Sequence, residues 1–64
     1  MFFQVEIDCD NDAFQNGRVK PEIRRLLEEA LTIKPKPGSV KVLLDSNGNS
    51  VGTARFIDGN IRIH

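Results

Sequence analysis

The stretch PEIRRLLEEALTI, residues 21 to 33, decides the fold of this chain. Its apolar side chains recur at the i, i+3, i+4, i+7 and i+8 spacing that places them on one side of an α-helix. They are Ile23, Leu26, Leu27, Ala30 and Leu31. Pro21 suits the first turn of a helix, because its missing N–H would have no partner there. We therefore predict one amphipathic helix whose apolar stripe is buried against a sheet.

The residues before this helix predict a strand followed by a short helical turn. Apolar and polar side chains alternate from Phe3 to Asp10, which is the pattern of a half-buried strand. Asn11 or Asp12 then caps a single turn that places Phe14 in the core.

The residues after the helix predict a hairpin, with strands 39–45 and 49–57 joined by the turn DSNG at 45–48. A two-residue type I′ turn at Asn47-Gly48 competes with a type I turn followed by a Gly bulge. The bulged register is preferred because it gathers apolar side chains on one face. That inner face carries Val40, Val42, Leu44, Ala54 and Phe56. Gly52 lies on the same face and would let the helix approach closely.

A second hairpin turn is predicted at Asp58-Gly59. A two-residue loop there pairs Phe56 with Ile61 and Ala54 with Ile63, which places both isoleucines on the inner face. The fold class is therefore α+β in the order β-α-β-β-β, a single domain over residues 1–64. One helix packs on one face of a four-stranded sheet that ends in an antiparallel meander.

The composition argues for a small cytoplasmic protein. Nine basic and nine acidic side chains cancel, so the chain lacks the positive field of a typical duplex-DNA binder. Cys9 is the only cysteine, which is compatible with a reducing compartment. We see no signal peptide and no apolar run approaching the ~20 residues of a membrane span.

The arrangement of three segments resembles a group of short, mostly uncharacterised proteins of bacteria, prophages and phages. These are the D-N-x-A-F segment at 10–14, the helix beginning EIRRLL at 22–27, and the D-x-N-G-N-x-V-G hairpin at 45–52. The resemblance covers most of the chain and implies a bacterial or mobile-element origin. It implies no activity, cofactor or catalytic residue.

No motif in the sequence predicts catalysis or metal binding. Asp8, Asp10 and Asp12 alternate as in a calcium loop, but Ala13 and Val19 stand where an EF-hand needs Gly and Glu. The single histidine, His64, ends the chain, and Cys9 follows an apolar strand without a base beside it in sequence. We therefore expect a protein that is not an enzyme and that binds no metal and no cofactor.

The outer face of the predicted sheet is the candidate site. A single helix covers only one face, so apolar side chains on the other face are left for a partner. The predicted partner-binding residues are Phe2, Leu43, Val51, Arg55, Ile57 and Arg62. Arg55 and Arg62 face each other in the chosen register, which indicates either a bound anion or neutralisation by Glu6.

Two functions fit this face. The first is a protein-binding module, either a phage or prophage effector or an accessory factor that self-associates. The second is a nucleic-acid-binding module that uses Arg55, Arg62 and Lys41 on a sheet platform. Such platforms stack bases on exposed aromatic rings, and only Phe2 is available. Protein binding is therefore preferred.

Overall fold

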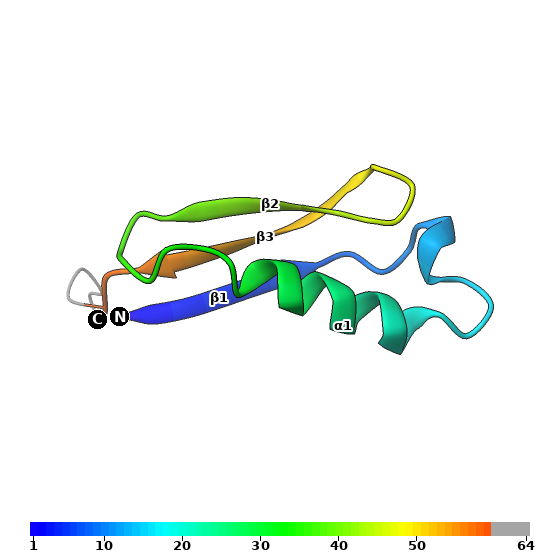
Figure 1. Ribbon diagram of the computed structural model, residues 1–64, viewed down its shortest axis with the longest axis horizontal. Coiled ribbons are helices and arrows are strands. Elements are labelled where there is room, and N and C mark those ends of the chain that lie inside the picture. The colour runs from blue at the N-terminus through cyan, green and yellow to red at the C-terminus, as the bar shows by residue number, and fades with distance from the viewer. Residues whose placement is uncertain (60–64) are drawn as a thin grey trace.

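The computed structural model describes residues 1–59 and has one helix packed on a three-stranded antiparallel sheet (Figure 1). The elements in chain order are β1 (Phe2–Ile7), the 3₁₀ turn η1 (Asp12–Phe14), α1 (Val19–Ala30), β2 (Val40–Leu44) and β3 (Ser50–Ile57). The α+β class is thus confirmed. The predicted fourth strand, with Ile61, Arg62 and Ile63, lies outside the described residues.

The sheet has the order β1-β3-β2, so β3 is the central strand. Phe3 of β1 pairs with Phe56, and Val5 pairs with Ala54. β1 therefore lies along the edge of β3 opposite β2. The predicted pairings of Phe56 with Ile61 and of Ala54 with Ile63 fall on residues outside the described range. β1 pairs with β3 over six residues, which gives this edge a long antiparallel ladder.

The turn between β2 and β3 has the predicted bulged form. The Gly48 N–H donates to the Asp45 carbonyl at 3.0 Å, and the Asp45 N–H donates to the Asn49 carbonyl at 2.8 Å. Gly48 has a φ of 84°, the left-handed conformation that a Gly bulge requires. Leu44 pairs with Ser50, as the bulged register predicts.

A second irregularity follows at Val51 and reverses the faces of β2. The register shifts between Leu43 and Leu44, so that Leu43 lies opposite Gly52 rather than Val51. Because one extra residue changes the alternation of a strand, Val51 and Ala54 are both buried although they are three positions apart. The side chain of Leu43 is completely buried as a result.

The predicted inner face of β2 is therefore wrong. Val40, Val42 and Leu44 were expected in the core but are 60%, 53% and 47% exposed. Leu43 and Val51 were expected on the outer face but belong to the core. The phase of the β3 prediction holds, since Ala54 is fully buried and Phe56 stacks against Phe3 on the same face, with ring centroids 4.7 Å apart.

Gly52 makes the close approach of β1 to β3 possible. A Cβ atom at this position would overlap the Glu6 carbonyl oxygen and lie 3.0 Å from the Ile7 Cα. The sequence interpretation assigned Gly52 to an approach of the helix. The element that comes close is instead the backbone of β1.

The helix begins two residues earlier than predicted, and a different side of it faces the core. Pro21 lies in its first turn, and the first i→i−4 bond is donated by the Glu22 N–H to the Arg18 carbonyl. Glu22, Leu26 and Ala30 form the buried row, whereas Leu27 is 42% and Leu31 73% exposed. Leu27 and Leu31 are thus not core residues, which corrects the predicted stripe.

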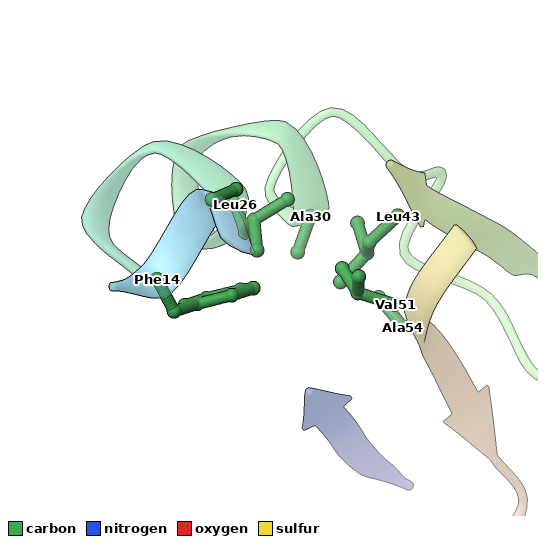
Figure 2. Packing of buried hydrophobic residues seen from close by; sticks show 7 residues of the cluster. Phe14, Leu26, Ala30, Leu43, Val51 and Ala54 are labelled. Atoms are coloured by element: carbon green, nitrogen blue, oxygen red, sulfur yellow. The ribbon is translucent and has the colours of Figure 1, made fainter. Parts of the chain in front are cut away.

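The core lies between α1, η1 and the β2–β3 hairpin. In Figure 2, Phe14, Leu26 and Ala30 point toward Leu43, Val51 and Ala54 of the hairpin. Phe14 is buried as predicted, with only 2% of its surface exposed. The short turn η1 therefore contributes to the core together with α1 and the β2–β3 hairpin.

Candidate interaction surface

The surface of the sheet that faces away from α1 is called the outer face here. Its residues follow from the strand register, because side chains alternate between the two faces of a sheet. They are Phe2, Gln4 and Glu6 of β1, Thr53, Arg55 and Ile57 of β3, and Val40, Val42 and Leu44 of β2. Within the described residues no helix covers this face.

The outer face is divided into apolar and polar parts. Val40, Val42 and Leu44 form a continuous aliphatic row along β2, and about half of each side chain is exposed. The neighbouring positions on β3 and β1 are polar, with Arg55 between Val40 and Gln4. An aliphatic row beside a polar rim is the pattern expected of a protein interface.

The structure places the predicted site residues that it describes in two different environments. Phe2, Arg55 and Ile57 lie on the outer face, as predicted. Leu43 and Val51 lie in the core and cannot contact a partner. Arg62 is outside the described residues. The sequence did not predict that the aliphatic row is exposed. The one signal for it is the spacing of three between the apolar residues Val51 and Ala54, which can share a face only if the strand contains a second bulge.

The structure defines the neighbours of Arg55 on this face, and its predicted partner Arg62 lies outside the described residues. Arg55 lies opposite Gln4 and Val40, where the sequence interpretation placed it opposite Arg62. The Nη2 atom of Arg55 donates to the Thr53 Oγ1 at 3.2 Å. Lys41 alternates with the aliphatic row and therefore lies on the helix side of the sheet. The basic cluster proposed for nucleic-acid binding is thus not assembled from Arg55 and Lys41.

Glu22 is a buried carboxylate that joins the start of α1 to the hairpin turn. It is 7% exposed, and it accepts hydrogen bonds from Arg25 Nη2 and from the Ser46 N–H, both at 2.8 Å. The Ser46 hydroxyl also donates to it at 2.8 Å. The hydrogen bond from Arg25, followed by that from Ser46, lowers the pKa of Glu22 against the opposing effect of burial.

Asp45 is a second buried carboxylate and organises the turn itself. Its Oδ1 accepts from the Asn47 and Asn49 N–H groups at 2.9 and 2.8 Å, and its Oδ2 accepts from Asn11 Nδ2 at 3.0 Å. Burial raises the pKa of Asp45, but the donors of Asn49, Asn11 and Asn47 outweigh it and lower the pKa. Asn11 therefore uses its side chain to hold the turn, and it makes no capping bond to η1.

These two carboxylates have the geometry of structural groups. The fold itself supplies the donors to both, and the lowered pKa values keep both acids ionised at neutral pH, so neither is suited to act as a general acid. Together they connect three segments that are distant in sequence: the residue before η1, the first turn of α1 and the β2–β3 turn.

We expect this network to make the fold acid-sensitive. A carboxyl whose pKa is lowered by folding stabilises the protein above its ordinary pKa of about 4, and this stability is lost as the pH falls through the lowered value. The urea midpoint, followed by circular dichroism, should therefore fall between about pH 5 and pH 2. Glu22→Gln should lower the midpoint at neutral pH and flatten its dependence on pH.

A matched control is Glu6→Gln on the outer face, where the side chain is exposed. This variant should keep the neutral midpoint and the full acid dependence of the parent protein. An unchanged pH dependence in Glu22→Gln would contradict the role given to Glu22.

The remaining chemistry of the described residues is sparse. No three His, Cys, Asp or Glu side chains within residues 1–59 gather closely enough to hold a metal ion. His64 lies outside this range. Over the same range, α1 is too short and too polar to cross a membrane. Comparisons of the chain with protein-family models, with curated proteins and with solved structures find no match.

Proposed function

We propose that this protein is a small non-enzymatic protein-binding module that acts through the outer face of its sheet. The aliphatic row of Val40, Val42 and Leu44 carries the proposal, since these side chains are 60%, 53% and 47% exposed. Exposure of apolar surface to water is unfavourable, so burial of this row by a partner would stabilise the complex. Phe2 and Ile57 extend the apolar surface at one end of the sheet.

The charge of the outer face favours a protein over a nucleic acid. Arg55 is the basic side chain that the described strands place there, and Glu6 lies on the same face. Nucleic-acid binding depends on several cations that contact phosphates together. The resemblance to short phage and prophage proteins adds a biological setting, in which the module would be an effector or accessory factor of a mobile element.

The test compares two valine-to-lysine variants. Val42→Lys places a charge in the middle of the aliphatic row, whereas Val19→Lys places the same charge at the start of α1, where Val19 is 42% exposed. Proteins captured from a bacterial extract by the parent protein are identified, purified and titrated. Val42→Lys should weaken binding of the purified partner at least about tenfold, because it buries an unpaired charge. Val19→Lys should bind like the parent.

Two outcomes would contradict the proposed function. One is a partner that binds Val42→Lys and the parent equally well. The other is tight binding of single-stranded oligonucleotides that weakens steeply with added salt, which is the signature of phosphate contacts.

A further inference from the structure

The exposed side of α1 carries a second apolar feature, distinct from the outer face. Ile23, Leu27 and Leu31 recur at every fourth position and form a ridge along the helix. Lys20, Arg24 and Glu28 form the neighbouring ridge, and the two ridges line an open groove between them. Ile23 is half-buried, Leu27 is 42% exposed and Leu31 is 73% exposed. A groove between two i±4 ridges is the shape into which a ridge of another helix packs.

The charges beside this groove are arranged in order along the helix. Lys20 and Arg24 lie in its N-terminal half and Glu28 lies in its C-terminal half. A parallel pairing of two such helices would bring like charges together at each of these positions. An antiparallel pairing about a two-fold axis brings Arg24 of each copy beside Glu28 of the other, and the symmetry makes this pair twice.

The same alignment also fits the apolar ridges together. When Arg24 is level with Glu28 of the second copy, Leu27 is level with Arg25 of the second copy, and Ile23 with Glu29. The leucine and isoleucine side chains of the two ridges therefore alternate along the common axis every second residue, about 3 Å apart given the 1.5 Å rise of a helix. They interdigitate and do not collide, so one register satisfies both the charges and the packing.

We infer that the groove of α1 is filled by α1 of a second copy of this chain, in an antiparallel two-fold dimer with reciprocal Arg24–Glu28 pairs. The net charge of zero adds no overall repulsion between two copies. A single helix pair buries a modest area, so the dimer is a weak one whose population depends on concentration. The outer face is not used and remains open to the partner of the proposed function.

Sedimentation velocity of the whole protein over about a hundredfold range of concentration tests this inference. The parent should shift from monomer to dimer as the concentration rises. Arg24→Glu alone and Glu28→Arg alone should each raise the Kd of the dimer about tenfold, because each replaces two attractive pairs by two repulsive ones. The double variant Arg24→Glu/Glu28→Arg should restore the affinity of the parent, since the pairs are re-formed with the charges exchanged.

Leu27→Ser tests the ridge and should raise the Kd about a hundredfold, because it removes two central side chains of the symmetric interface. Circular dichroism shows whether each variant is folded, and if Leu27→Ser is not, the more exposed Leu31→Ser replaces it. Val42→Lys on the outer face should leave the dimer unchanged.

Four results would overturn the inference. The first three are a parent protein that stays monomeric throughout, a dimer that tolerates both Leu27→Ser and the single charge reversals, and a double variant that remains as weak as the single ones. A dimer that is lost in Val42→Lys would also overturn it and would identify the outer face as the self-association site.

Discussion

Replacement of Leu43 by alanine is expected to remove a large part of the stability of the folded protein. The side chain is completely buried between α1 and β3, in contact with the cluster that contains Leu26 and Ala30. Truncation of a buried leucine costs about 2–5 kcal/mol, since it removes transfer free energy and leaves a cavity. A domain of this size has a total stability of only about 3–10 kcal/mol. One truncation thus removes a large part of the whole.

The neighbouring residue provides a matched control. Leu44→Ala makes the same chemical change one position further, where the side chain is 47% exposed on the outer face. It should cost about 1 kcal/mol or less, because little apolar area is returned to water. Urea denaturation followed by circular dichroism suits this chain, which has no Trp or Tyr for fluorescence. If Leu44→Ala were the more destabilising variant, the register that the sequence alone predicts would be the correct one.

Gly52→Ala is expected to have a comparable effect for a different reason. The added methyl group would overlap the Glu6 carbonyl oxygen, and this obstacle is backbone that cannot rotate away. β1 must then separate from β3, which disrupts the pairs of Ile7 with Gly52 and of Glu6 with Thr53. Overpacking of a well-packed site typically costs about 1–3 kcal/mol, and we expect at least the upper end here. Amide exchange of β1 residues should accelerate with the loss of stability.

Gly48→Ala separates this steric effect from backbone strain. Gly48 has a left-handed φ of 84°, but a Cβ there would meet nothing within 4 Å. Its replacement should therefore cost only the conformational penalty of about 1–2 kcal/mol and leave the β1–β3 pairing intact. An equal loss of protection in β1 for both variants would show that the close contact at Gly52 does not decide the β1–β3 geometry.

The position of the candidate site depends on the register irregularity between β2 and β3 at Val51. If β2 and β3 paired without the irregularity at Val51, Leu43 and Val51 would lie outside and the aliphatic row would form the core. With it, Val40, Val42 and Leu44 are available to a partner. The outer face is therefore partly apolar because burial of Leu43 in the core leaves Val40, Val42 and Leu44 on the opposite side of β2.

Local patterns in the sequence determined those parts of the structure that depend on near neighbours. The i, i+3, i+4 spacing from Ile23 onward determined the helix. Asp45 and Gly48 determined the bulged turn, because one supplies acceptors for the turn N–H groups and the other allows positive φ. The alternation from Phe3 to Ile7 determined β1. Each feature is encoded within a few residues, so the sequence is sufficient to find it.

Tertiary structure decided which faces these elements bury. The segment Val40–Leu44 has an apolar residue at almost every position, so either phase of its alternation is acceptable locally. The phase is decided by packing against Phe14, Leu26 and Ala30. Leu43 and Val51 both pack against these three side chains in the core. The same long-range packing turned Leu27 away from the core and brought β1 against β3. Such contacts join residues distant in the chain, and their free energy depends on shape in three dimensions, which no local pattern of polar and apolar residues contains.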